Sequence, residues 1–251
     1  MRIDILTLFD EYMDMVLGQS ILGRARKAGY LDIRTHNFRN FATDKHATVD
    51  DTPYGGGKGM LLKPAPICDC YDAVIADAKK KPLTVYLSPK GQVLTQEIAR
   101  RYAKEDRIVF VCGHYEGVDQ RVIEEIVDEE LSIGDYVLTG GELACAVAVD
   151  CVCRMVEGVL DSEECFEEES HYNGLLEYPH YTRPVEFRGR RVPEVLLEGK
   201  HAEIERWRRD EMLKITKERR PDMLKTVSLT PQDLDFLEKK DTPPVLFAKG
   251  E

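Results

Sequence analysis

The residues best suited to binding chemistry lie in a glycine-bearing run from Ser132 to Glu142. Gly134, Gly140 and Gly141 can adopt positive φ without steric cost, so main-chain N–H and C=O groups beside them can approach a flat ligand closely. Two glycines directly before Glu142 and an apolar run also indicate a loop that leads into a helix N-terminus, where unpaired N–H groups collect. An ordinary turn is the simpler interpretation of Gly140 and Gly141 taken alone.

Two other loops share this composition, and each follows an apolar run suited to a buried strand. One spans Tyr86 to Gly91 and the other spans Cys112 to Gly117. In parallel α/β sheets, ligands bind where the strands deliver their C-terminal loops. Three loops of one type therefore predict a single pocket lined largely by backbone, with the run from Ser132 as one wall.

A fourth glycine-rich segment, Pro53 to Met60, invites comparison with the phosphate-binding P-loop. That motif needs Ser or Thr after its lysine and a glycine further upstream, and those positions hold Gly59 and Thr52. No G-x-G-x-x-G follows a predicted strand either. The sequence thus supports neither an ordinary nucleotide hydrolase nor a dinucleotide enzyme. Tyr54, beside three glycines, instead offers a ring that could stack on a nucleobase.

The elements that must position these loops alternate between strand and helix. Short β-branched or apolar runs predict buried strands at residues 3–8, 83–87 and 107–112, and Leu94, Ile98 and Tyr102 recur at helical spacing between the last two. The run from Leu143 to Val156 is apolar on nearly every face, which predicts a helix buried by the sheet or by a partner. We expect an α/β fold with a parallel sheet.

The last third of the chain has a different pattern. Residues 161–174 are acidic and non-periodic, which predicts a flexible linker between a domain at 1–160 and a helical domain at 175–251. In that second domain Ile204, Trp207, Met212 and Ile215 fall on one side of a predicted helix. Thr230 and Pro231 begin another, as an N-cap followed by proline at the first helical position.

Charge is unevenly distributed around a formal net of -11, which alone argues against a protein devoted to nucleic acid. Between Glu116 and Glu177 there are 18 Asp and Glu against two Lys and Arg, whereas residues 183–225 carry 13 Lys and Arg against nine Asp and Glu. The basic clusters there, among them Arg188 to Arg191, would contact phosphates or simply face solvent.

Composition and motifs also exclude several classes of protein. Seven cysteines in apolar contexts, without a secretion signal, predict free thiols in a reducing cytoplasm. The C-x-C pairs at 68/70 and 151/153 do not have zinc-finger spacing. No apolar stretch is long enough to span a membrane.

Six segments together resemble the bacterial tRNA (guanine-N1)-methyltransferases of the TrmD family, a SPOUT class. The likeness runs in register from Met1 to about Lys225. The segments are Asp44 to Asp51, Pro53 to Gly57, Tyr86 to Pro89, Cys112 to Gly117, Ser132 to Glu142 and Pro179 to Pro184.

This resemblance implies a fold, a cofactor and partners. The fold would be a parallel-sheet SPOUT domain with a deep trefoil knot plus a smaller helical C-terminal domain. The protein would be a cytoplasmic homodimer that binds S-adenosylmethionine, with a tRNA site shared between subunits and a requirement for Mg²⁺, although no dedicated protein metal site is evident. The implied cofactor-binding residues are Tyr86, Leu87, Ser88, Pro89, Gly113, Tyr115, Glu116, Gly117, Ser132, Ile133, Gly134, Tyr136, Val137, Leu138, Gly140 and Gly141.

The implied reaction moves a methyl group to N1 of guanosine 37 in tRNA. That nitrogen carries a proton at neutral pH, so a carboxylate must remove it while a cation stabilises charge on O6. By position Arg154 is the cation and Glu169 the base; family members usually carry Asp there, and the extra methylene changes reach more than basicity. Glu167 and Glu168 remain alternatives.

The implied substrate-binding residues lie in two regions of the chain, although His180 would equally serve as a packing residue. They are Asp50, Tyr54, Gly55, Gly56, Gly57, Ser170, His180 and Arg183. Two rival functions are also compatible with the sequence. One is a non-catalytic RNA-binding protein that keeps the fold, and the other is a SPOUT enzyme that methylates ribosomal RNA or a 2′-hydroxyl.

Overall fold

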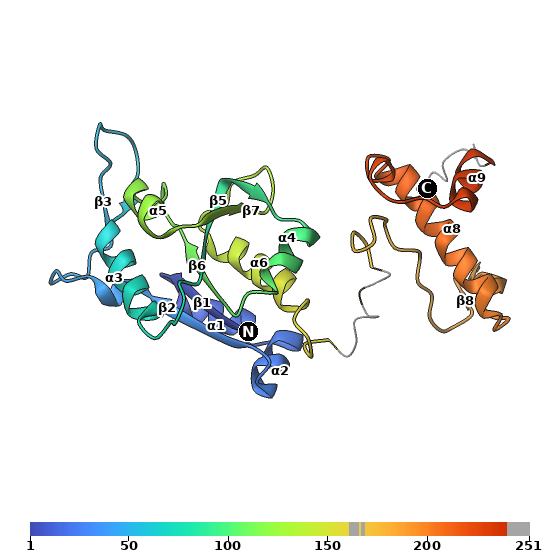
Figure 1. Ribbon diagram of the computed structural model, residues 1–251, viewed down its shortest axis with the longest axis horizontal. Coiled ribbons are helices and arrows are strands. Elements are labelled where there is room, and N and C mark those ends of the chain that lie inside the picture. The colour runs from blue at the N-terminus through green and yellow to red at the C-terminus, as the bar shows by residue number, and fades with distance from the viewer. Residues whose placement is uncertain (161–165, 167–168, 240–251) are drawn as a thin grey trace. The chain divides into compact units, whose positions relative to one another are not determined.

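The computed structural model describes residues 1–160, 166 and 169–239. The chain divides into two compact units, Met1–Ser162 and Glu163–Glu251, which we call unit 1 and unit 2 (Figure 1). Of the predicted linker, residues 161–165, 167 and 168 lie outside the described part. The linker and the domain limits given above stay predictions.

A five-stranded parallel sheet forms the centre of unit 1, in the order β2-β1-β6-β5-β7. Its side chains alternate between two apolar layers: Ile108 and Phe110 of β6 pack on one face, and Val109 and Val111 on the other. Burial on both faces is typical of parallel strands and explains their continuous apolar runs. The strands are β1 (Arg2–Thr7), β2 (Asp32–Asn37), β5 (Leu83–Val93), β6 (Arg107–Cys112) and β7 (Glu129–Ser132).

Helices cover both faces of this sheet (Figure 1). One layer contains α1 (Asp10–Leu17), α2 (Ser20–Ala28), α4 (Gln96–Tyr102) and α6 (Glu142–Cys153). The other contains the short 3-10 helix η1 (Phe38–Phe41), α3 (Pro64–Ile75) and α5 (Gln120–Ile126). Local sequence sets the helix limits, since the Thr95 hydroxyl caps α4 by accepting from the Ile98 N–H and Gly29 ends α2 in the left-handed conformation.

Strand β7 pairs twice with β5. Leu87 and Gln92 both have Leu131 as their register partner. The Leu94 N–H donates to the Ser132 carbonyl at 2.8 Å. Residues between the two pairings bend around β7 so closely that a Cβ at Gly91 would lie 2.4 Å from the Glu130 backbone. Only glycine fits this crossing.

A small antiparallel hairpin stands beside the sheet. It consists of β3 (Asp50–Asp51) and β4 (Leu61–Leu62), with the glycine-rich segment between them. Its returning strand is tied to the loop after β6, because the Leu62 N–H donates to the Gly117 carbonyl and Leu62 accepts from the Asp119 N–H.

Unit 2 is built around the long helix α8 (His201–Arg219). Leu175, Tyr178, Met212 and Leu213 form its core, with Trp207 and Phe236 packed against them. The Thr230 hydroxyl accepts from the Asp233 N–H and so caps α9, as predicted. The other elements are β8 (Glu186–Phe187), β9 (Arg190–Arg191), the 3-10 helices η2 (Glu194–Leu196) and η3 (Met223–Lys225), and α9 (Pro231–Lys239).

The structure confirms the predicted parallel α/β class, the three predicted strands and the helix between the last two. It extends the second strand from residue 87 to Val93, so the segment from Tyr86 to Gly91, predicted as a loop, is a bend within β5. It corrects two helices. The apolar helix ends at Cys153 rather than Val156, and on α8 the core-facing side is formed by Met212, Leu213 and Thr216, so that Ile215 is only half-buried. No described helix is long and apolar enough to cross a membrane.

Candidate functional site

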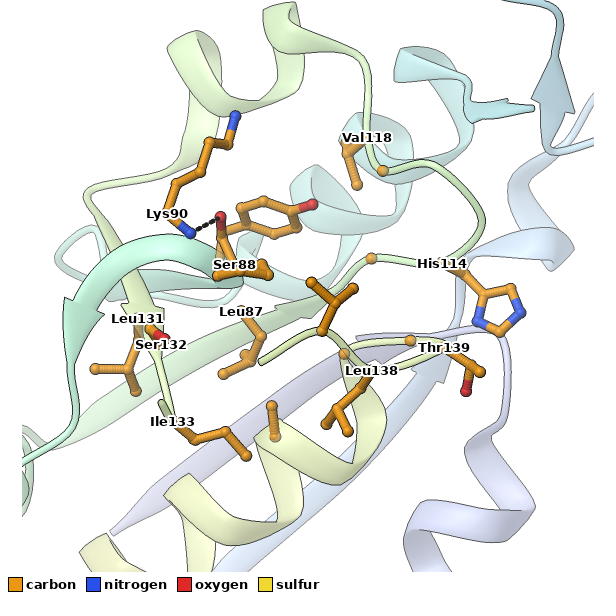
Figure 2. Close-up of a pocket in the computed structure, with 18 of the residues that line it drawn as sticks. Leu87, Ser88, Lys90, His114, Val118, Leu131, Ser132, Ile133, Leu138 and Thr139 are labelled. Carbon is orange, nitrogen blue, oxygen red and sulfur yellow. Dashed lines mark hydrogen bonds between the residues drawn. The ribbon is translucent and has the colours of Figure 1, made fainter. Parts of the chain in front are cut away.

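A cavity of about 280 Å³ opens beside the bend of β5 and the C-terminal ends of β6 and β7 (Figure 2). The three glycine-bearing loops line it together, as their composition predicts. Every residue named above for cofactor binding contributes to its wall, from Tyr86 through Gly113 to Gly141. The structure therefore brings these residues together, and their ligand stays a prediction.

The first loop gives the cavity a buried tyrosine and a compact turn. The Ser88 hydroxyl accepts from the Lys90 N–H at 3.1 Å, which folds the backbone back directly after the buried part of β5 (Figure 2). Burial raises the pKa of Tyr86 to about 12, so its hydroxyl stays protonated at neutral pH. A Cβ at Gly113 would lie 2.7 Å from that hydroxyl oxygen, which explains why the second loop carries glycine there.

The second and third loops are joined by backbone contacts. The Gly141 N–H donates to the Gly113 carbonyl at 2.7 Å, and His114 and Gly140 form an antiparallel bridge. A Cβ at Gly141 would lie 3.0 Å from the backbone of Cys112 and Gly113. The paired glycines therefore allow two backbone segments to pack closely at the mouth of the pocket.

The third loop folds on itself through local hydrogen bonds. The Gly134 N–H donates to the Ser132 hydroxyl at 3.2 Å, and that hydroxyl lies 3.1 Å from the Gly134 carbonyl. The Tyr136 hydroxyl donates to the Ile133 carbonyl at 3.1 Å, so its ring covers Gly134. Val137 and Leu138, which follow in the same loop, are exposed and line the cavity.

A buried carboxylate, that of Glu142, lies beside the contact between the second and third loops. Glu142, the first residue of α6, accepts a hydrogen bond of 2.9 Å from the Thr7 hydroxyl, and its other oxygen lies 3.9 Å from Nδ1 of His114. Any Cβ at Gly140 would approach that oxygen and that nitrogen to 2.4 and 2.6 Å. The His114 ring also packs against Phe9. Glycine at 140 thus allows the acid and the histidine to face each other.

Several lining residues were absent from the sequence-based set. Most are neighbours within the same loops, so the motif boundaries alone could have suggested them, whereas Gln120, Ile123 and Ala144 come from helices that close the cavity. They are Lys90, His114, Val118, Gln120, Ile123, Leu131, Thr139 and Ala144.

The expected substrate residues of unit 1 lie on the adjacent hairpin. Tyr54 is fully exposed, and Gly55, Gly56 and Gly57 all have positive φ. The hairpin meets the cavity wall at Glu116, whose N–H donates to the Met60 carbonyl and whose side chain packs on Gly59. Asp50 pairs with Leu62 in the same hairpin. This arrangement places an exposed aromatic ring on the element that borders the cavity.

The expected catalytic residues fall in different units. Arg154 is the C-cap residue of α6 in unit 1, directly after the apolar helix ends. Glu169 lies in unit 2, where its carbonyl accepts from the Tyr172 N–H. The alternatives Glu167 and Glu168 lie outside the described residues.

Unit 2 also holds the remaining substrate residues. The Ser170 hydroxyl accepts from the Glu177 N–H at 3.0 Å, which shapes the turn before the core. His180 is exposed and rests against Tyr178 with ring centroids 4.7 Å apart, and Arg183 is exposed. His180 is therefore an accessible side chain as well as a packing neighbour.

No group of three His, Cys, Asp or Glu side chains in the described part of the chain is placed to hold a metal ion. The cavity suits an organic ligand, since apolar side chains such as Leu87, Ile133 and Leu138 line it together with the backbone of the glycine-bearing loops.

Comparison with known proteins points to one family. The model of the family described as tRNA (Guanine-1)-methyltransferase TrmD matches residues 1–226. A tRNA (guanine-N(1)-)-methyltransferase of Ruminiclostridium cellulolyticum is 52% identical over 223 residues, which cover 89% of this chain and 96% of the relative. One from Clostridium perfringens is 52% identical over 96% of this chain and its own full length. One from Anoxybacillus flavithermus is 52% identical over 95% of this chain and 98% of its own length.

Proposed function

The chain belongs to the TrmD family of tRNA (guanine-1)-methyltransferases, and on that premise we propose that it moves the methyl group of S-adenosylmethionine to N1 of guanosine 37 in tRNA. The observation that carries the proposal is the convergence of all three glycine-bearing loops on one cavity. Its position at the C-terminal ends of parallel strands is where such sheets bind ligands.

The cavity residues fit this cofactor. Gly113 and Gly141 let Tyr86 and the backbone of Cys112 pack closely and so hold the loops of the cavity wall together. Main-chain N–H and C=O groups of the third loop, which lines the cavity, are suited to the edge of an adenine ring. Leu87, Ile133 and Leu138 offer apolar surface to the flat faces of the ring (Figure 2). S-adenosylmethionine, when bound, supplies an electrophilic methyl group.

In the proposed mechanism, the chain's own residues prepare the guanine. The Glu169 carboxylate would accept the proton from N1, which frees the nitrogen lone pair to attack the methyl carbon. The N–C bond would form as the methyl–sulfur bond breaks, with S-adenosylhomocysteine as the leaving group. The Arg154 guanidinium donates to O6 and stabilises the negative charge that develops there. Tyr54 and the glycines beside it lie on the hairpin that meets the cavity wall at Glu116, and they would contact the nucleotide. Ser170, His180 and Arg183 are the proposed contacts from unit 2.

We also propose a homodimer, supported by α6. Most of this helix is buried, yet Leu143 and Val147 are 51% and 49% exposed, one helical turn apart. A second copy of the chain would cover them and would complete a tRNA site to which both subunits contribute. The deep trefoil knot belongs to the same proposal, supported by the way β5 bends around β7. An enzyme of tRNA would act in the cytoplasm.

The decisive experiment methylates defined RNAs in vitro. The purified chain is incubated with S-adenosylmethionine and tRNA transcripts that carry G or A at position 37, and the modified nucleoside is mapped. We expect 1-methylguanosine at position 37 only in the G37 transcript. A methylated 2′-hydroxyl, or methylated ribosomal RNA alone, would replace the proposal with the second rival. Calorimetry that finds no binding of S-adenosylmethionine would favour the non-catalytic rival.

A further inference from the structure

Residues 186–191 of unit 2 form a short arm, which we call the arginine hairpin. Glu186 pairs with Arg191 and Phe187 with Arg190, across a two-residue turn in which Arg188 and Gly189 have φ of 52° and 74°. All of its residues are exposed. Because an isolated two-stranded hairpin is only marginally stable in water, a hairpin with no apolar face buried is better suited to contact a partner than to support the fold.

The arginine hairpin carries an exposed aromatic ring. Phe187 is 62% exposed, although phenylalanine is normally among the most buried residue types. The Arg188 guanidinium lies over the ring, 5.1 Å from its centroid. This contact orients the ring from one side and leaves most of its surface accessible, as a stacking platform requires.

The arm is also strongly basic. Arg188, Arg190 and Arg191 stand against one acid, Glu186, whose carboxylate lies 3.9 Å from Nε of Arg191 with both side chains more than half exposed. An exposed pair of this kind contributes little and is easily exchanged for another anion. The chain as a whole has a net charge of -11, so three arginines within six residues form a local positive patch that attracts a polyanionic partner.

We propose that the arginine hairpin docks the tRNA substrate, with Phe187 stacked on an unpaired nucleobase and the arginines on the neighbouring phosphates. The combination of an exposed aromatic ring and guanidinium groups is what single-stranded parts of RNA bind. An anionic membrane is a poorer fit, because Phe187 and its exposed neighbour Val185 together offer little apolar area for insertion. The inference rests on tRNA being the substrate, and it adds the element and the binding mode.

The contribution of the arginine hairpin to tRNA affinity is tested by equilibrium binding of unmodified tRNA to the full chain at several salt concentrations. For the double variant R190Q/R191Q we expect the Kd for tRNA to rise about tenfold and the salt slope to fall by about one for each arginine. The matched control is K79Q/K80Q, which removes the same charge from an exposed turn of unit 1. It should change the Kd less than twofold.

The stacking contact is tested separately at Phe187. F187A should weaken tRNA binding about fivefold without changing the salt slope, and F187W should restore it, since base–aromatic stacking does not depend on charge. The fluorescence of Trp207, the only tryptophan of the unmodified chain, verifies that unit 2 stays folded in R190Q/R191Q and F187A, and circular dichroism verifies it in F187W, which has a second tryptophan.

Three results would overturn the inference. They are an R190Q/R191Q effect no larger than that of K79Q/K80Q, unchanged tRNA affinity in F187A, and hairpin-dependent binding to phosphatidylserine vesicles with unchanged tRNA affinity. Because binding is measured directly, absent methyl transfer in the unmodified chain would contradict the proposed reaction and leave this test intact.

Discussion

The Thr7 hydroxyl donates a hydrogen bond of 2.9 Å to the Glu142 carboxylate and thereby joins the end of β1 to the first residue of α6. Both residues are buried. Glu142 in turn faces His114 in the pocket wall, so the first strand of the sheet helps to hold a loop that lies more than a hundred residues later in the chain.

Removing that donor should weaken both the fold and the pocket. In T7V the buried carboxylate loses its hydrogen bond, and we expect a loss of about 1–3 kcal/mol in the free energy of unfolding. Affinity for S-adenosylmethionine should fall in parallel. Urea denaturation and calorimetry measure the two effects. T7S keeps the hydroxyl and should behave nearly like the unmodified chain. A T7V protein as stable as the unmodified chain, or a T7S protein that loses more than T7V, would show that the methyl group matters more than the hydrogen bond.

The crossing of β5 over β7 should tolerate no side chain. In G91A the new Cβ would lie 2.4 Å from backbone atoms of Glu130 and Leu131, which cannot yield as a flexible side chain can. We expect a loss of about 1–3 kcal/mol or more, typical of overpacking, together with weaker cofactor binding. G29A is the control, because nothing lies within 4 Å of its Cβ and only the left-handed backbone is penalised. A G91A protein with unchanged stability and cofactor affinity would contradict the crossing.

Substitution of the proposed base, Glu169, or the proposed cation, Arg154, should lower the rate of methyl transfer without weakening cofactor binding. We expect E169A and R154A each to lower the single-turnover rate of methyl transfer by about 10² or more while S-adenosylmethionine binding stays nearly intact. E169D tests whether the shorter acid reaches N1. E203Q, which removes an exposed acid of α8, is the control. An unchanged rate in either alanine variant would remove that residue from the mechanism, and Glu167 and Glu168 would then be tested as the base.

Unit 2 should lose stability in acid through Asp233. Burial opposes ionisation of this carboxyl group, but hydrogen bonds from Arg209 and from Thr230 outweigh it and lower its pKa to about 2. A depressed pKa stabilises the fold above the unfolded value near 3.9, and that contribution, about 2 kcal/mol, is lost as the pH falls from about 4 to 2.

Trp207 fluorescence during acid titration measures this effect within unit 2. D233N should be less stable at pH 7 and should lose less on acidification between pH 4 and 2. D222N removes an exposed carboxylate that pairs with Arg220 and serves as the control, with a much smaller expected effect. Identical acid profiles for D233N and the unmodified chain would refute the assignment.

The exposed residues of α6 should control assembly. V147E and L143E place a charge on the only exposed apolar stretch of an otherwise buried helix, and we expect each to convert a dimer into a monomer in sedimentation experiments. L234E in unit 2 alters an equally exposed leucine and should leave the assembly unchanged. A dimer that persists in both α6 variants would place the interface elsewhere.

Much of the pocket could be predicted because its three loops combine glycine with short apolar strands. The sequence was less informative where polar residues form strands. Asp32, Thr35 and His36 belong to β2, an edge strand with one half-exposed face, and so lack a continuous apolar run. In β7, Glu129 lies in an acidic run without the apolar residues of a buried strand, yet its carboxylate accepts from both Arg101 and the Tyr102 hydroxyl of α4. Such partners become visible only in three dimensions.

The double pairing of β7 has a consequence for how the protein is made. Residues 83–93 leave the ribosome well before residues 129–132, around which they bend. The bend of β5 can therefore close around β7 only after β7 has been made. The chain between the two strands forms a long loop, and closing that loop carries an entropic cost. We expect a chain arrested before Ser132 to contain the first two loops without a binding site, so that cofactor affinity arises at one late point of translation.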